Sequence, residues 1–489
     1  MASPSKNIFW LSVSRVFALV LVAIAYFALF RYLGPENSGK YQFVLSFSTL
    51  FGVVIDLGLA QYIIKKISEQ PQKLTYYFKH FLAAEILLSI CVYAALMFCS
   101  ISFGFEPVIL KSIAVFGVGM VLAGLQYPFL AVMSSHHDLR KVAFINFLSS
   151  LCNVATIAVT IVFGLGIVFL SINTTLAGVI ALALYWYYTR PYLGSYSFFK
   201  LYSNFDLSEV KSIFLAAIPF ALLTGFATIY NRIDIVLVSK LLGYTETGFY
   251  TAAYKFVDLM NFFPAVVSHV LYPLFSQQFA YSRISEARSI IERYLKVTMF
   301  AAVPIGVFGS LLAGKIILLI AGKEYAPGAE ALTILAFAVT ILIGYIVMNP
   351  IMISQLTRIA VVMTAVNVLV NVVGNWVLLP YIGIKGAAIM TVACELLQLI
   401  GYYYFVYTRV IKFSAVTNWM KVLVAGSGMG FVLYIIRDFS VSSYLSNSHY
   451  ILSTIFDLVL LGTTSVLVYV GILTLLRYVS WEEIKQWKK

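Results

Sequence analysis

The sequence predicts an all-α polytopic membrane protein of about 14 transmembrane helices, built as two parallel six-helix repeats followed by a C-terminal helix pair. Three observations lead to this fold class: the composition, the regular return of long apolar runs, and an internal duplication. Of the 489 residues, 61% are hydrophobic and only 11% are charged. Soluble domains carry about 25% charged residues, so the composition excludes a soluble protein of this length.

Apolar runs long enough to cross the hydrocarbon core, about 20 residues each, recur along the chain. The first run contains Arg15 and extends beyond a short hydrophobic core, so it predicts a retained span rather than a signal peptide. The predicted spans are 8–31, 41–64, 80–103, 108–133, 143–164, 166–189, 213–239, 248–274, 297–320, 330–354, 360–380, 386–408, 420–437 and 451–476.

The basic residues are distributed unevenly between alternate loops. With a cytoplasmic N-terminus, the cytoplasmic loops hold 22 of the 33 Lys and Arg residues and the outer loops hold seven. An excess of basic residues marks the cytoplasmic side. We therefore expect both termini in the cytoplasm and a multi-pass protein in the cell (inner) membrane. The net charge of +13 implies no nucleic-acid partner, because its cations belong to these loops.

An internal duplication relates the two halves of the chain. The motif LGxxxxGxY starts at Leu33 and again at Leu242, 209 residues later, and Asn153 matches Asn371 at an offset of 218. Six spans per half is an even number, so the repeats enter the membrane in the same direction, related by an axis along the membrane normal. The predicted organisation is an N-terminal six-helix bundle (1–190), a cytoplasmic connector (191–212), a C-terminal six-helix bundle (213–409), and an extra helix pair with a cytoplasmic tail (410–489).

Charged residues inside spans are costly and normally face protein or a water-filled cavity. In this sequence they lie on equivalent helices, the first two spans of each half, as a cavity between the halves would require. The alternative is that Lys255 with Asp258 forms an intrahelical pair, and Arg15 with Asp56 a buried interhelical pair, which serve only packing. The candidate cavity residues are Arg15, Arg232 and Lys255 as cations, and Asp56, Asp234 and Asp258 as the acids that hold or tune them.

Polar side chains also recur at helical spacing on apolar spans, which suggests an aqueous lumen rather than a dry bundle. Asn371 is a candidate cavity residue for this reason. Glu85, Glu395 and Asp457 are isolated acids within spans, each either a proton carrier or a structural group. The stripes are Thr224, Thr228 and Arg232; Asn367, Asn371 and Asn375; and Asn146 with Asn153. The four cysteines have no metal-binding spacing, and we expect no catalytic residue, metal or cofactor, only a coupling ion of unknown identity.

The segment NRIDIVLVSKLLGYTETGFYTAAYKF (231–256), the duplicated turn motif and the basic cytoplasmic loops resemble the polysaccharide flippases, also called O-antigen or lipid-linked oligosaccharide translocases. These belong to the multidrug, oligosaccharidyl-lipid and polysaccharide exporter (MOP) superfamily. The resemblance implies transport of a polyprenyl-diphosphate-linked oligosaccharide from the cytoplasmic to the outer leaflet, by alternating access, for biosynthesis of surface polysaccharide such as the O-antigen of lipopolysaccharide. It also implies three partners besides membrane lipids: the lipid-linked oligosaccharide, a polysaccharide polymerase and a chain-length regulator. The predicted cations would then bind the diphosphate.

Two other classes of function stay open from the sequence. A lipid II or multidrug exporter of the same superfamily would share the architecture, although multidrug exporters generally have twelve spans. A membrane polysaccharide polymerase or glycosyltransferase would belong to a different class. The sequence has no acid two positions after any Asp, no outer loop longer than about 15 residues, and no nucleotide-binding motif, so we expect a secondary transporter rather than an enzyme.

Overall fold

The computed structural model describes residues 4–56, 59–136, 138–193, 207–414, 416–438 and 450–478. Within these ranges every regular element is a helix, and 11 helices are long and apolar enough to cross a membrane. Large apolar side chains remain exposed on their outer faces, among them Phe98 at 72% and Leu475 at 84%. Apolar surface of this extent is stable against lipid and not against water, so the protein is a multi-pass membrane protein.

Each of the 11 candidate spans overlaps one of the predicted spans, but the limits differ, most of all for the predicted span 297–320, whose counterpart is Ile284–Leu311. The other three predicted spans, 8–31, 41–64 and 213–239, fall on α1 (Pro4–Asp56) and α8 (Leu207–Leu241), which are helical but are not among the 11. The helical membrane fold is therefore confirmed, and the count of 14 stays a prediction.

By their contacts the residues form two compact units, 1–240 and 241–489. The contacts group α8 with the first unit, whereas the proposed duplication begins the second half at 213, so the domain limits stay a prediction. The remaining elements of the first unit are α2 (Leu59–Glu69), η1 (Pro71–Lys73), α3 (Leu74–Ser102), α4 (Pro107–Gly124), α5 (Tyr127–Ser135), α6 (Leu139–Val162) and α7 (Ile167–Leu193).

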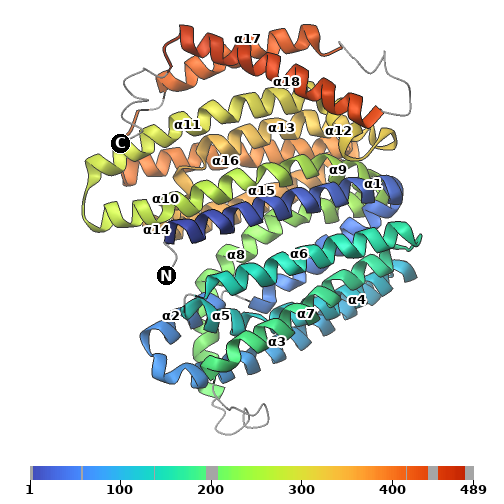
Figure 1. The fold of residues 1–489 in the computed structure, drawn as a ribbon, viewed down its shortest axis with the longest axis vertical. Coiled ribbons are helices and arrows are strands. Elements are labelled where there is room, and N and C mark those ends of the chain that lie inside the picture. Colours follow the sequence, from blue (N-terminus) through green and yellow to red (C-terminus); the bar gives the residue numbers. More distant parts are fainter. Residues whose placement is uncertain are drawn as a thin grey trace. The chain divides into compact units, whose positions relative to one another are not determined.

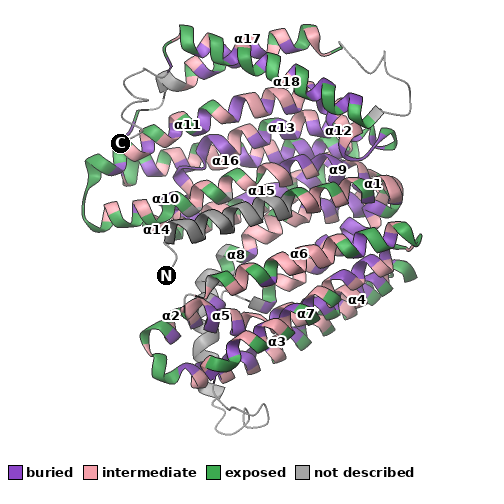
Figure 2. Ribbon diagram, viewed as in Figure 1, coloured by how far each residue is buried: buried purple, intermediate pink, exposed green. Residues whose placement is uncertain are grey.

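The core of the second unit is centred on α13. Of the 11 candidate spans, the one formed by α13 has the largest buried share (Figure 2). Helices α11 and α16 pack on α13, and α17 packs on α11 and α18 (Figure 1). The elements of this unit are α9 (Tyr244–Met260), α10 (Phe262–Ala280), α11 (Ile284–Leu311), α12 (Ala313–Ile320), η3 (Lys323–Tyr325), α13 (Gly328–Tyr345), α14 (Met348–Gln355), α15 (Thr357–Ile382), α16 (Ile384–Arg409), α17 (Val416–Ile436) and α18 (Tyr450–Leu475).

The turns between helices repeat along the chain. Gly34 interrupts α1 with φ 69° and ψ 174°, and Gly243 precedes α9 with φ 95° and ψ 176°. Glycine reaches these angles without the steric cost that a Cβ imposes. The described glycines with positive φ form three pairs at offsets of 209, 218 and 219, namely Gly34 with Gly243, Gly104 with Gly322, and Gly164 with Gly383. The order of turns and helices thus recurs, while the orientation of one repeat relative to the other stays a prediction.

Two of the predicted spans are broken into two helices, and in each case a proline lies in the first turn after the break. The fourth predicted span ends as α4 at Gly124 and resumes as α5, in whose first turn Pro128 lies. Likewise α13 ends at Tyr345 and α14 carries Pro350 in its first turn. Proline lacks the N–H of a helix interior but is compatible with a first turn. The break in the first unit adjoins a cavity, which Gln126 lines.

Candidate functional site

Two adjoining cavities lie within the first unit. The larger has a volume of about 680 Å³ and is called the amide cavity after Gln126, Asn146, Asn153 and Asn173, which line it. The smaller, of about 320 Å³, is called the threonine cavity after Thr49, Thr174, Thr224 and Thr228. Both are lined by Ala123 and Thr174, which makes them neighbours. Among the described residues, no charged side chain lines either cavity.

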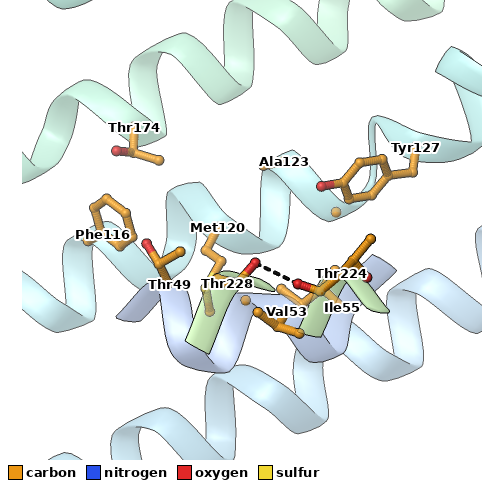
Figure 3. Close-up of a pocket in the computed structure, with 12 residues that line it drawn as sticks. Thr49, Val53, Ile55, Phe116, Met120, Ala123, Tyr127, Thr174, Thr224 and Thr228 are labelled. Atoms are coloured by element: carbon orange, nitrogen blue, oxygen red, sulfur yellow. Dashed lines mark hydrogen bonds between the residues drawn. The ribbon is translucent and has the colours of Figure 1, made fainter. Parts of the chain in front are cut away.

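The threonine cavity is formed by α1, α4, α7 and α8 (Figure 3). Thr228 Oγ1 donates a hydrogen bond of 2.9 Å to the backbone carbonyl of Thr224, one turn earlier on α8. A hydroxyl that donates in this way keeps acceptor capacity for a ligand. The sequence predicted that Thr224 and Thr228 share a face, and that face meets the threonine cavity.

The amide cavity draws its carboxamides from three places. Asn146 and Asn153 lie seven residues apart on α6, Asn173 lies on α7, and Gln126 precedes α5 at the helix break. Gln126 Nε2 donates to the carbonyls of Leu122 at 3.3 Å and of α7 Gly178 at 3.4 Å. The first bond joins Gln126 to the last turn of α4, and the second holds the helix break against α7.

Close packing of α4 against α7 fixes the cavity wall. A Cβ on Gly119 would stand 2.6 Å from the backbone carbon of Thr174, so only glycine allows this approach. Thr175 Oγ1 donates a hydrogen bond of 2.8 Å to the carbonyl of Val115. Small residues and interhelical hydrogen bonds of this kind are how membrane helices pack closely. The contact positions Asn173 and Thr174 at the two cavities.

Of the four predicted charges of the first unit, only Arg232 and Asp234 have described side chains, and neither lines the two cavities. The side chains of Arg15 and Asp56 lie outside the described residues. Arg232 is half-buried and forms no ion pair with a described residue. Asp234 is 4% exposed and is engaged by interactions within the protein. Their role in substrate binding therefore stays a prediction.

In the second unit, Lys255 Nζ lies 3.2 Å from Asp258 Oδ2 along α9. This intrahelical pair is the one that the packing alternative predicted, and Lys255 has a further interaction within the protein. The two side chains keep 19% and 35% of their exposure, so the pair is within reach of a polar ligand.

The predicted asparagine stripe of α15 is packed inside the second unit. Asn367 and Asn375 are at most 1% exposed, and Asn371 is fully buried. Asn375 Nδ2 donates to Asn371 Oδ1 at 3.2 Å, and Asn367 Nδ2 donates to Gln398 Oε1 on α16. The stripe thus takes part in a buried polar network, and a cavity role for Asn371 stays a prediction.

Two isolated acids of the second unit are paired with residues on other helices. Tyr345 donates a hydrogen bond of 2.7 Å to Glu395 Oε2. Asp457 of α18, 3% exposed, lies 3.1 Å from Lys315 Nζ of α12. This ion pair joins the C-terminal helix pair to the preceding helices. These contacts support the interpretation of Glu395 and Asp457 as structural groups rather than as proton carriers.

Sequence reasoning missed Gln126, Asn173 and Thr174. A signal was present, because Asn173, Thr174 and Thr175 form a polar triplet inside an otherwise apolar span. The triplet has no helical periodicity, and periodicity was the criterion that identified the stripes.

A charged cluster closes the turn between α5 and α6 in the first unit. Lys141 Nζ donates to Asp138 Oδ2 at 2.6 Å, and the Tyr192 hydroxyl donates to the same oxygen. Burial raises the pKa of Asp138, but these hydrogen bonds outweigh burial and lower its pKa below the ordinary value. The cluster ties the end of α7 to the start of α6.

Comparison with known proteins identifies the family of this chain. A family model described as polysaccharide biosynthesis protein matches residues 5–279, more than half of the sequence. The chain belongs to this family. It is 25% identical to the capsular polysaccharide biosynthesis protein CapF of Staphylococcus aureus over 223 residues, 45% of this chain and 56% of that one. It is 27% identical to the probable flippase AglR of Haloferax volcanii over 170 residues, 33% of this chain and 35% of that one.

The alignments thus span little more than half of CapF and about a third of AglR. Solved structures show the fold over a longer range. The lipid II flippase MurJ, in an inward closed conformation, aligns with a TM-score of 0.75 over 95% of this chain and 98% of its own, at 15% identity. An inward-facing multidrug resistance MATE transporter aligns with a TM-score of 0.63 over 79% and 93%, at 13% identity. The chain therefore has the fold that these two transporters share.

Proposed function

We propose that this protein is a flippase that moves a polyprenyl-diphosphate-linked oligosaccharide from the cytoplasmic to the outer leaflet of the cell (inner) membrane, for surface polysaccharide biosynthesis. The observation that carries the proposal is the pair of uncharged, hydroxyl- and amide-lined cavities in a membrane protein of the polysaccharide biosynthesis family. A hydrated glycan crossing an apolar bilayer needs such replacement hydrogen bonds.

The diphosphate needs cations. Arg15, Arg232 and Lys255 are the proposed ligands, with Asp56, Asp234 and Asp258 holding or tuning them, because charge-assisted hydrogen bonds are the strongest available to a diphosphate. Alternating access would carry the bound lipid-linked oligosaccharide across, driven by a coupling ion and with both termini cytoplasmic. A polymerase and a chain-length regulator would take up the exported product.

The test is glycan export in cells that lack their own flippase, scored together with the amount of folded protein. Arg15→Gln, Arg232→Gln and Lys255→Gln should each lower export about tenfold, since hydrogen bonds to charged groups contribute about 1.5–3 kcal/mol, and Arg→Lys should be milder. Lys65→Gln is the matched control, because Lys65 loses the same charge on a side chain that is 73% exposed. Normal export by all three variants at normal abundance would contradict the proposed cation site.

A second candidate is a lipid II flippase, favoured by the alignment with MurJ over 95% of the chain. The two candidates differ in which lipid-linked sugar is carried. Complementation of a strain depleted of its lipid II flippase, without restoration of surface polysaccharide in the first strain, would decide for this alternative.

A further inference from the structure

We propose that the amide cavity is the subsite that binds the sugar hydroxyls of the transported glycan, apart from the diphosphate. This inference rests on the proposed function and assigns one part of its substrate to named residues. It is carried by the composition of the cavity, an unpartnered amide oxygen, and the rigid wall between α4 and α7.

The chemistry of the cavity suits hydroxyl groups. Asn146, Asn153 and Asn173 each carry a carbonyl oxygen and an NH₂ group, and Gln126 contributes its carbonyl oxygen, because its NH₂ group donates to the carbonyls of Leu122 and Gly178. A sugar hydroxyl likewise both donates and accepts, so one carboxamide can bind two neighbouring hydroxyls. The cavity volume of about 680 Å³ lies in the range of small-molecule sites, about 300–1,000 Å³.

Asn173 supplies an independent observation. Its side chain is 9% exposed, and its Oδ1 has no hydrogen-bond partner among the described residues. A buried amide oxygen without a partner is destabilising unless a ligand or water donates to it. Asn173 lines the amide cavity, so a sugar hydroxyl bound there can serve as the donor.

The absence of charge separates this subsite from the diphosphate. The residues that line the amide cavity, all within the described structure, include no Lys or Arg, and a diphosphate without a cation would lose its hydration uncompensated. Phe147 and Ala177 add apolar surface, against which the carbon face of a sugar ring can pack.

Close packing of α4 against α7 forms the wall of the amide cavity without a bound ligand. The Thr175 hydroxyl on α7 donates a hydrogen bond to the carbonyl of Val115 on α4. A Cβ on Gly178 would lie 2.9 Å from Leu122 Cβ, so these two helices are in close contact. A site held by close helix packing keeps its hydrogen-bonding groups oriented before the ligand arrives. It can therefore discriminate a sugar-bearing lipid from a bare one, because a group built to bind a hydroxyl is left unpaired by the analogue that lacks it.

The experiment compares two probes on the full-length protein in lipid nanodiscs: a polyprenyl diphosphate, and the same lipid carrying one N-acetylglucosamine. The wild type should bind the sugar-bearing probe at least tenfold more tightly. Asn173→Ala and Asn153→Ala should each remove most of this difference without changing the affinity for the bare lipid. Asn153 is half-buried, so its variant keeps the test informative where Asn173→Ala fails to fold.

Gln72→Ala is the matched control, because Gln72 loses the same carboxamide at an exposed position outside the cavity. Its affinities should equal those of the wild type. Equal binding of both probes by the wild type, or an equal loss of both in the asparagine variants, would overturn the sugar subsite alone. Failure of the wild type to bind either probe would contradict the proposed function itself. Binding of ethidium that is lost in the asparagine variants would assign the cavity to drug-like cations and overturn the inference.

Discussion

The two units contain equivalent asparagines in different surroundings. Asn153 on α6 and Asn371 on α15 match in the duplication, 218 residues apart. Asn153 lines the amide cavity, whereas Asn371 is fully buried and accepts a hydrogen bond from Asn375. Helical spacing therefore predicts which polar side chains share a face, but not what that face meets.

The neighbouring helix makes the difference. In the first unit, α7 brings the small residues Ala177, Gly178 and Ala181 to the cavity wall, so space remains. In the second unit, α16 packs on α15 with the longer side chain of Gln398, which accepts from Asn367. The same polar stripe thus lines a cavity in one unit and stabilises the interior in the other. Four experiments test this comparison, in order of decreasing expected effect.

The largest effect is expected at the ion pair of the second unit. Asp457→Asn removes the carboxylate that lies 3.1 Å from Lys315 Nζ. Breaking a buried pair on one side costs about 3–5 kcal/mol, and we expect the lower end because the Lys315 side chain keeps 23% of its exposure. Membrane abundance and the thermal midpoint of the purified protein measure the loss. Removing Lys65, whose partner Glu69 is 3.8 Å away on an exposed surface, should change neither, and an unchanged midpoint in Asp457→Asn would contradict a structural role.

Gly119→Ala should come next. The new Cβ would stand 2.6 Å from the backbone of Thr174, so α4 and α7 must separate, at a cost of about 1–3 kcal/mol. Because Thr174 lines both cavities, export should fall as well. Gly471→Ala is the control, since a Cβ there meets no atom within 4 Å. Equal behaviour of the two variants would show that close packing does not hold the cavities.

The equivalent asparagines provide the third test. Asn371→Leu removes the acceptor of Asn375 inside the buried network and should lower the free energy of unfolding by about 1–2 kcal/mol. Asn153→Leu should change it by less than about 0.5 kcal/mol, as is usual for less buried positions, and should lower export instead. Chemical denaturation and the export assay separate the two. If Asn371→Leu lost export at normal stability, the result would contradict a purely structural role and would support a role of Asn371 in transport.

The smallest effect is a pH dependence of the α5–α6 turn. The folded-state pKa of Asp138 is lowered, so its stabilisation is present above the unfolded-state value of about 3.9 and is lost as the pH falls through the folded-state pKa. Because the Asp138 and Lys141 side chains keep 26% and 38% of their exposure, solvent screens the pair and we expect less than about 1 kcal/mol. The thermal midpoint of the wild type should approach that of Asp138→Asn below about pH 4, with no such convergence between pH 7 and 5. A constant difference down to pH 3 would contradict this account.

The sequence by itself determined the membrane class and most of the helix pattern. Long apolar runs with few charges have no other stable environment, and this physical constraint is local. Glycine with positive φ at a turn is a local constraint as well, so Gly34 and Gly243 mark turns that recur with the sequence motif. Proline alone does not locate a helix break, because Pro273 and Pro304 lie inside continuous helices, whereas Pro128 and Pro350 lie in first turns after a break.

Only the tertiary structure decided which polar groups line a cavity. A stripe of asparagines on an apolar helix must be satisfied, and a neighbouring helix or a ligand can satisfy it equally well. The spacing of the asparagines in the sequence does not indicate whether a neighbouring helix or a ligand satisfies them. Asn173 and Gln126 are identified as site residues only by the close approach of α7 to α4 and by the helix break before α5. Asn371 became part of the interior because α16 fills the space beside α15.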